Sequence, residues 1–285
     1  MKENRKLPLI AAHQGVAQCG YILGNTLDAF DIALKDGADI IELDAALSAD
    51  GEVFTFHPGT EPVRLNLPRN ALAQMKSEEI RELRLVQPDK SLTYFPICTL
   101  EESLRHLKGR CYINVDKSWT CLPQIMEVVR RVGVSDQVIL KSNIRGENWK
   151  REVLEVEQYA PDVCYMPVFY EEDTASEFIE SRNVRYFGAE VVFKTEESML
   201  ASEAYIDRMH EKGRKLWVNA IVFNYRTVLS AGHTDDISLK DPELGWGWMV
   251  RHNFDIIQTD WARELSLYRA IEAQVSTPSH AQAIR

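Results

Sequence analysis

The sequence lacks any long apolar run. No stretch approaches the roughly 20 residues that cross a bilayer. The N-terminal segment "MKENRKLPLIAAHQG" passes from charged residues into a short strand-like run, without the apolar region of a signal peptide. We therefore expect no transmembrane segment and a cytoplasmic location.

A surplus of positive charge is also lacking. The 33 Lys and Arg residues are outnumbered by 43 Asp and Glu residues, which gives a net charge of −10. Such a composition offers no basic surface for a nucleic-acid backbone. We expect a small-molecule ligand and no nucleic acid, and the composition makes no prediction of oligomeric state. An anionic ligand would need local cations, backbone N–H groups or a bound metal ion.

Paired cysteines are missing as well. The five cysteines are odd in number and none forms a C-x-x-C motif. This usage is typical of reduced thiols and disfavours a disulfide framework or a zinc site. The residues concerned are Cys19, Cys98, Cys111, Cys121 and Cys164.

What the sequence does contain is an alternation of strand-like and helix-like segments. The expected strands are 7–13, 39–48, 111–116, 137–142, 163–170, 185–193, 216–224 and 254–260. No G-x-G-x-x-G motif follows the first of them, which disfavours a dinucleotide-binding open sheet. Eight alternating units predict an α/β fold, a closed (β/α)₈ TIM barrel. We expect one domain with its core over 7–270 and a flexible tail over 273–285.

Helix start and stop signals support this reading. "TLEESLRHLKG" opens with Thr99 and Glu102 as a capping box and closes on Gly109. After the second strand, "ADGEVFTFH" predicts a turn and a short return strand that ends at His57. A short β-hairpin insertion after the second strand is therefore expected.

Acidic side chains gather where the expected strands end. Glu42 and Asp44 are two residues apart, so both point into the barrel while Ile41 and Leu43 face the helices. Asp116 ends the third strand at the corresponding level. Buried carboxylates that converge need a cation between them, and an all-oxygen set favours Mg²⁺ or Ca²⁺ over zinc.

Two histidines are expected on the same rim. His13 ends the first strand, and the return strand brings His57 back toward the carboxylates. One imidazole could accept a proton from a nucleophile and the other donate one to a leaving oxygen, while a metal ion neutralises phosphate charge. This arrangement suits the cleavage of phosphoesters.

These motifs resemble those of the glycerophosphodiester phosphodiesterases. The family carries His-Arg-Gly after its first strand, Glu-Asn-Thr before its first helix, Glu-x-Asp on its second strand and a His after the next. The corresponding segments here are "HQG" (13–15), "GNT" (24–26), "ELD" (42–44) and "FTFH" (54–57). Further matches are "PICTLEESL" (96–104), "LWVNA" (216–220) and "IIQTDWARELSLY" (256–268).

The resemblance implies a metal-dependent barrel that splits glycerophosphodiesters into glycerol 3-phosphate and an alcohol. Glu42, Asp44 and Asp116 would hold the divalent cation, and His13 and His57 would form the acid–base pair. The glycerol 2-hydroxyl would attack phosphorus to form a cyclic phosphate, which water then opens. In "LWVNA", Trp217 and Asn219 are expected to bind substrate.

The chain also departs from the family pattern. Gln14 stands where the family has its arginine, and Gly24 where it has the preceding glutamate. Loss of both charges together is what an exchanged ion pair would leave. Lys117 follows Asp116 directly, which predicts that it points to the opposite side of a regular strand. We therefore expect Gln14 and Lys141 to contribute to substrate binding, with Lys141 supplying the phosphate-binding cation.

Two long loops are expected to select the substrate. Residues 58–95 contain Arg64, which could reach the phosphate. Residues 225–245 contain His233, Asp235 and Asp236, whose charge would suit a cationic alcohol such as choline. Aromatic residues near the rim could line a pocket for glycerol or the headgroup: Trp119, Trp217 and Phe223.

Two alternatives to a glycerophosphodiesterase remain open. One is a phospholipase-D-like lipid phosphodiesterase of the same fold group, whose final product is a cyclic phosphate. The other is a barrel that binds a phosphodiester without turning it over, which the loss of the arginine at Gln14 makes conceivable.

Overall fold

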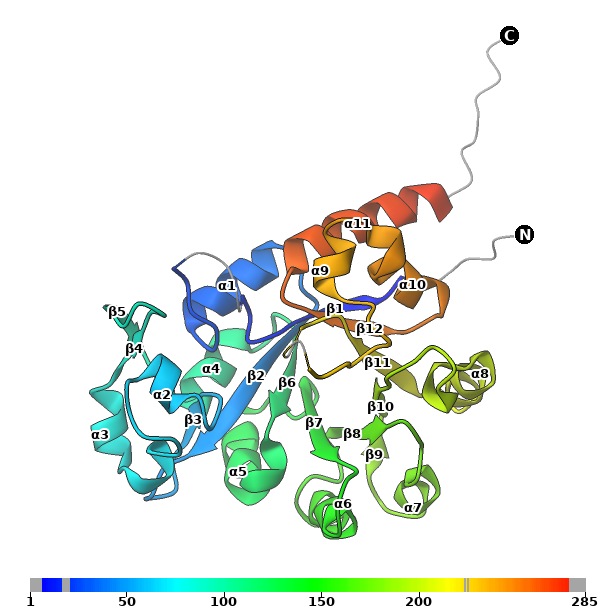
Figure 1. Ribbon diagram of the computed structural model, residues 1–285. Helices are drawn as coiled ribbons and strands as arrows, with labels where there is room; N and C mark the ends of the chain where they lie inside the picture. Colours follow the sequence, from blue (N-terminus) through cyan, green and yellow to red (C-terminus); the bar gives the residue numbers. More distant parts are fainter. Residues whose placement is uncertain (1–6, 17–20, 223, 225, 277–285) are drawn as a thin grey trace.

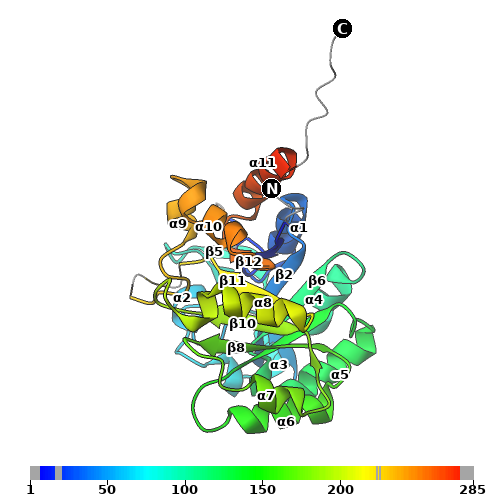
Figure 2. The ribbon, with the colours of Figure 1, turned by 90° about the vertical axis from the view of Figure 1, so that its right-hand side faces the viewer.

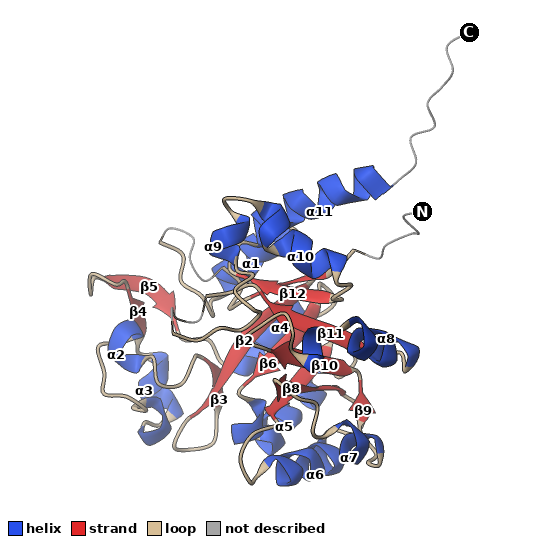
Figure 3. Cartoon of the chain, turned by 45° about the vertical axis from the view of Figure 1, so that its right-hand side comes forward, coloured by secondary structure: helices blue, strands red, loops and turns tan. Residues whose placement is uncertain are grey.

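Eight parallel strands close into a barrel in the computed structural model, which describes residues 7–16, 21–222, 224 and 226–276. Closure is complete because β1 pairs with both β12 and β2. Figures 1 and 3 show the strands at the centre with helices around them. The barrel strands are β1 (Leu9–Ala12), β2 (Ile40–Leu47), β6 (Tyr112–Asp116), β7 (Val138–Asn143), β8 (Cys164–Tyr170), β10 (Gly188–Val192), β11 (Lys215–Asn219) and β12 (Ile256–Thr259). The predicted TIM barrel is confirmed.

An outer ring of helices follows the strands in turn. Each barrel strand leads to one helix of this ring before the next barrel strand begins. Figure 2 shows α11 and α1 on one side of the molecule, with α5, α6 and α7 on the other. The ring consists of α1 (Leu27–Lys35), α4 (Leu100–Leu107), α5 (Leu122–Val132), α6 (Trp149–Tyr159), α7 (Ser176–Glu180), α8 (Glu203–Glu211), α10 (Trp246–Arg251) and α11 (Ala262–Ser276).

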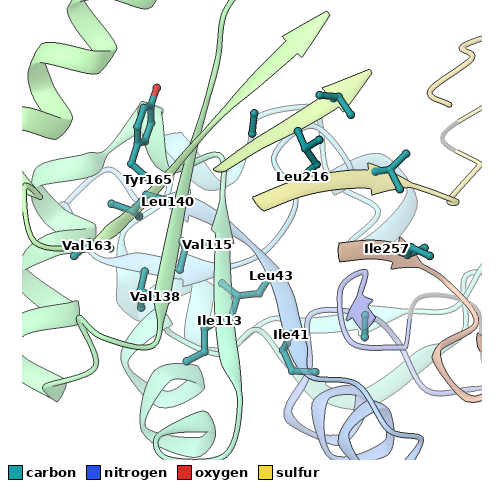
Figure 4. Close-up of a cluster of buried hydrophobic side chains, with 14 of the residues drawn as sticks. Ile41, Leu43, Ile113, Val115, Val138, Leu140, Val163, Tyr165, Leu216 and Ile257 are labelled. Carbon is teal, nitrogen blue, oxygen red and sulfur yellow. The ribbon is translucent and has the colours of Figure 1, made fainter. Parts of the chain in front are cut away.

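The two-residue period of the strands divides the core into two layers. Ile41 and Leu43 lie fully buried between strands and helices, as predicted, and Figure 4 shows them among other outward-facing side chains. The alternate residues fill the inside of the barrel. This inner cluster consists of Ala11, Ile40, Ile139, Cys164, Met166, Trp217 and Ile256. The polar side chains of the strand ends continue this inner face.

An insertion follows β2 and positions His57. The far end of β2 pairs with the antiparallel strand β3 (Val53–Thr55), which confirms the expected hairpin. The insertion continues through α2 (Glu61–Arg64), α3 (Ser77–Arg81), β4 (Arg84–Val86) and β5 (Leu92–Pro96). Figure 1 shows these elements on one side of the barrel. They enclose a small apolar core of their own, which includes Phe54, Phe56 and Leu72.

The structure differs from the expected segments in three places. The expected strand 185–193 is split into β9 (Arg185–Tyr186) and β10, which pair with separate parts of β8. β11 ends at Asn219 rather than at residue 224. α11 continues to Ser276, so the first residues of the expected tail are helical, and 277–285 lie outside the described residues.

The cysteine prediction holds for the described thiols. Cys98, Cys111, Cys121 and Cys164 are free, and Cys19 lies outside the described residues. Among the described helices, none is long and apolar enough to cross a membrane.

The capping box of α4 supports the strand that leads to His57. Thr99 accepts a hydrogen bond from the Glu102 N–H, and Glu102 accepts one from the Thr99 N–H. We expect Thr99→Ala to lower the free energy of unfolding by about 1 kcal/mol, measured by denaturant titration. Thr99→Ser keeps the hydroxyl and is expected to retain most of the stability. Equal losses in the two variants would contradict the capping role.

Candidate active site

A cavity of about 620 Å³ opens at the carboxyl ends of the barrel strands. This is the end at which TIM-barrel enzymes carry their active sites. The structure brings most of the expected site residues together in its wall: His13, Gln14, Glu42, Asp44, His57, Asp116, Lys141 and Asn219. Trp217 is the exception, since it is fully buried beneath the cavity.

Three carboxylates form the acidic centre of the cavity. One oxygen of each of Glu42, Asp44 and Asp116 lies within 4.8 Å of the others. Glu42 and Asp44 are almost completely buried. Burial and the neighbouring charge of Asp44 raise the pKa of Glu42 to about 8. A cation among the three would offset this repulsion and desolvation.

The surrounding donors are compatible with a bound divalent cation. Glu42 Oε2 accepts the Gln14 N–H at 2.8 Å. Asp44 Oδ2 accepts the side-chain amides of Gln14 at 2.8 Å and Asn25 at 2.9 Å. These bonds occupy one oxygen of each carboxylate and orient the group, which leaves the other oxygen for a metal. The residues present therefore fit an oxygen-ligated Mg²⁺ or Ca²⁺.

Gln14 and Gly24, the two departures from the family pattern, lie against each other. Gln14 has a left-handed backbone with φ of 53°, which lets both its main-chain and its side-chain N–H groups reach the acidic centre. A Cβ on Gly24 would lie 2.9 Å from the Gln14 Cβ and Oε1 atoms. The absence of a side chain at Gly24 therefore makes room for Gln14, so the two replacements form one structural unit.

Lys117 lies on the opposite side from the one expected. β6 ends at Asp116, and Lys117 adopts a left-handed conformation with φ of 60° and ψ of 13°. This turn brings its ammonium group 2.6 Å from Asp116 Oδ2 and 3.9 Å from Asp44 Oδ1. Although burial acts in the other direction, Lys117 and Lys141 lower the pKa of Asp116.

His13 is held by a residue that the sequence analysis did not assign. Its Nδ1 lies 2.7 Å from Asp260 Oδ1, just beyond the end of β12. Burial alone would lower the pKa of His13, but the hydrogen bond to Asp260 and the charges of Glu42, Asp260 and Asp44 raise it to about 9. The signal was the "TD" that ends the last strand, which lies beside the first strand once the barrel closes.

Asp235 supports Asp260, and the expectation that Asp235 contacts a cationic alcohol is wrong. Asp235 is only 2% exposed and does not line the cavity. Its carboxylate accepts hydrogen bonds from Trp246 Nε1 at 2.8 Å, Thr259 Oγ1 at 2.7 Å and the Asp260 N–H at 2.9 Å. Burial raises the pKa of Asp235 to about 7. His233, from the same loop, stacks on Trp248 and pairs with Glu196 instead of lining the cavity.

His57 lines the same cavity as His13 and lies near Asp44. Its Nδ1 is 3.0 Å from the Pro58 carbonyl oxygen, and its Nε2 is 3.9 Å from Asp44 Oδ1. A carbonyl can only accept, so Nδ1 carries the proton in the neutral ring and Nε2 is left as the basic nitrogen.

Lys141 belongs to a buried polar group in the cavity wall. Its ammonium lies 2.6 Å from Glu190 Oε2 and 3.4 Å from the centre of the Trp217 ring. Asn219 Nδ2 donates to Glu190 Oε1 at 2.7 Å, and Trp217 Nε1 donates to Gln258 at 3.0 Å. Trp217 therefore supports Lys141 from below, whereas the sequence analysis expected it to contact substrate.

The insertion loop and the rim contribute further cavity residues. Arg64 and Trp119 line the cavity as expected. Arg69 from the insertion and Arg145 from the loop after β7 also line it. Phe223 lies outside the described residues.

Solved structures of other proteins share the architecture of this chain. A solved glycerophosphoryl diester phosphodiesterase from Parabacteroides distasonis matches with a TM-score of 0.75 and 21% identity over 95% of this chain and 88% of that chain. The Oleispira antarctica phosphodiesterase OLEI02445, solved with the product sn-glycerol-3-phosphate, matches with a TM-score of 0.66 and 15% identity over 95% of this chain and 98% of that chain. The chain has the fold of the glycerophosphodiester phosphodiesterases. The resemblance predicted from the motifs is confirmed in the fold.

Sequence comparisons reach only part of the chain. The model DUF4996, described as a domain of unknown function, matches residues 165–269. This region runs from β8 into α11 and contains Glu190, Asp235 and Asp260. An uncharacterised Bacillus subtilis protein, YqiK, is 28% identical over 144 residues, which are 47% of this chain and 57% of that relative. A putative glycerophosphodiester phosphodiesterase of Bacillus subtilis, YhdW, is 36% identical over 75 residues, which are 26% of this chain and 28% of that relative. The chain thus spans little more than half the length of one of these relatives and less of the other.

The carboxylate geometry predicts a single divalent-cation site. We expect calorimetric titration with Mg²⁺ and Ca²⁺ to detect one site, which Asp44→Asn or Glu42→Gln weakens by at least about tenfold, since loss of supporting groups alone costs 10–100-fold. Glu180→Gln removes a surface carboxylate paired with Lys212 and serves as control. Unchanged affinity in Asp44→Asn would contradict the assignment.

Proposed function

We propose that this protein hydrolyses glycerophosphodiesters to glycerol 3-phosphate and an alcohol, with a divalent cation. The observation that carries the proposal is the convergence of His13, His57 and three buried carboxylates on one cavity. The fold adds support, since proteins named as glycerophosphodiester phosphodiesterases share it. A cytoplasmic location stays a prediction.

Glu42, Asp44 and Asp116 would hold the cation. When bound, it would neutralise negative charge on the phosphate oxygens. Gln14 and Asn25 would keep Asp44 oriented through their amide hydrogen bonds. These two amides already orient Asp44 before the substrate binds, so little reorganisation is needed during the reaction.

The two histidines would divide the proton transfers. His57 Nε2 would take the proton of the glycerol 2-hydroxyl as its oxygen forms a bond to phosphorus. The bond from phosphorus to the alcohol oxygen breaks, and His13 would donate a proton to that oxygen. The resulting cyclic phosphate is opened by water with the roles reversed, which returns both protons. Attack from within the substrate gains from proximity.

The hydrogen bonds of the two rings support this division. Asp260 is an anionic partner for His13 Nδ1–H and stabilises the protonated ring. His57 has only the neutral Pro58 carbonyl at Nδ1. Each contact leaves Nε2 as the nitrogen that serves the substrate.

Turnover provides the direct test. We expect release of glycerol 3-phosphate from a panel of glycerophosphodiesters with Mg²⁺ or Ca²⁺, and loss of this activity with EDTA. His13→Ala and His57→Ala should each lower kcat by about 10²–10⁴-fold, the usual contribution of a general acid or base.

His210→Ala is the control for these substitutions, because His210 pairs with Asp255 near the start of β12. Full turnover after both active-site histidine changes would overturn the acid–base assignment. Accumulation of cyclic phosphate as the final product would favour the phospholipase-D-like alternative, and binding without turnover would favour a non-catalytic barrel.

The Asp260–His13 contact predicts a shift in pH dependence. His13 must be protonated to act as the acid, so activity falls as pH rises through its pKa, which Asp260 raises. Asp260→Asn should therefore move the alkaline limb of kcat/KM to lower pH. Asp255→Asn, which alters the His210–Asp255 pair outside the cavity, should leave the profile in place. An unmoved limb in Asp260→Asn would show that this pair does not set the acid.

A further inference from the structure

The carboxylates that line the cavity already have partners or a proposed metal-binding role. Five described carboxylates line the cavity: Glu42, Asp44, Asp116, Glu190 and Asp260. The first three form the acidic centre, where Lys117 already lies beside Asp116. Glu190 pairs with Lys141 and accepts from Asn219, and Asp260 holds His13. Each of these carboxylates has a partner or a metal-binding role, so none is left for an ammonium group on the substrate.

The cations that remain are guanidinium groups. Arg64, at the end of α2, has no hydrogen bond or ion pair to its side chain within the described ranges. Burial lowers the pKa of Arg64, as expected for a charge that is partly withdrawn from water without a counter-ion. Within the described part of the chain, the Arg69 side chain donates only to the Gly59 carbonyl, at 3.3 Å.

Arg145, from the loop after β7, completes this set. Its guanidinium carbon lies 3.1 Å from the centre of the Tyr170 ring. No carboxylate pairs with it among the residues that the structure describes. Arg64, Arg69 and Arg145 thus give the cavity three positive groups whose charge no described carboxylate balances.

Two of the aromatic side chains that line the cavity, Tyr170 and Trp119, already have cations of the chain over their rings, and a third, Phe56, is only 3% exposed. Choline-like groups are recognised by aromatic faces. Tyr170 carries Arg145, and the Lys117 ammonium lies 5.5 Å from the centre of the Trp119 ring. A quaternary ammonium would have to displace a like charge at either ring.

We propose that this cavity selects a phosphodiester whose alcohol carries its own negative charge, a carboxylate or a second phosphate, bound by Arg64, Arg69 and Arg145. The hydrolysis step in this proposal rests on the proposed function, whereas the charge preference does not. It reverses the expectation of a cationic alcohol, because the residues of the 225–245 loop that line the cavity are Thr227 and Leu229 and not its acidic residues.

Binding of phosphate monoesters tests the charge preference without turnover. The probes are phosphocholine, glycerol 3-phosphate and 3-phosphoglycerate, which carry a cationic, a neutral and an anionic tail. Calorimetric titration of the full, cation-loaded chain should give at least tenfold tighter binding of 3-phosphoglycerate than of phosphocholine. Equal affinities, or tighter binding of phosphocholine, would overturn the proposal.

Substitutions then assign the preference to the guanidinium groups. Arg64→Gln and Arg145→Gln should each reduce the affinity ratio by several-fold, and Arg64→Glu should move it toward phosphocholine. Arg105→Gln, which removes a surface guanidinium paired with Glu101, should leave the ratio unchanged. A ratio that none of the cavity substitutions alters would overturn the assignment.

Turnover separates this proposal from the proposed function. With diesters of glycerol, kcat/KM should be higher for glycerate as the alcohol than for choline. No turnover of any diester, with the binding preference intact, would contradict the proposed function and support the charge preference. Turnover that favours the choline diester would support the proposed function and contradict the charge preference.

Discussion

Two buried carboxylates on the same face of β2 constrain the residues around them. Glu42 and Asp44 are 2% and 1% exposed, and both point into a barrel whose lower part is apolar. Such a pair is stable only where donors and positive charge surround it. The backbone and side chain of Gln14, the amide of Asn25 and the ammonium of Lys117 meet this need within the chain. The left-handed backbones of Gln14, Asn25 and Lys117 are the local cost of bringing these groups inward.

The sequence was sufficient wherever a regular period controlled the outcome. The two-residue alternation of β2 correctly separated Glu42 and Asp44 from Ile41 and Leu43, because nothing interrupts that strand. The capping box at Thr99 also formed as its spacing predicted. These features depend on neighbours a few residues apart, and local patterns describe such neighbours well.

Other site features depended on information that no local pattern carries. Lys117 points inward because a single residue leaves the strand geometry. Asp260 reaches His13 only through the closure of the barrel, and Asp235 is a buried acceptor rather than a ligand for a cationic alcohol because its loop packs against the end of β12. The pairing of Lys141 with Glu190 likewise joins strands that are far apart in the chain.

Closure of the barrel determines when the contact between His13 and Asp260 can form. His13 and Asp260 are separated by 247 positions and come from the first and last strands. During synthesis the imidazole therefore emerges 247 positions before its carboxylate partner. A chain that ends before β12 would therefore contain Glu42, Asp44 and Asp116 and yet have an imidazole without its anionic partner.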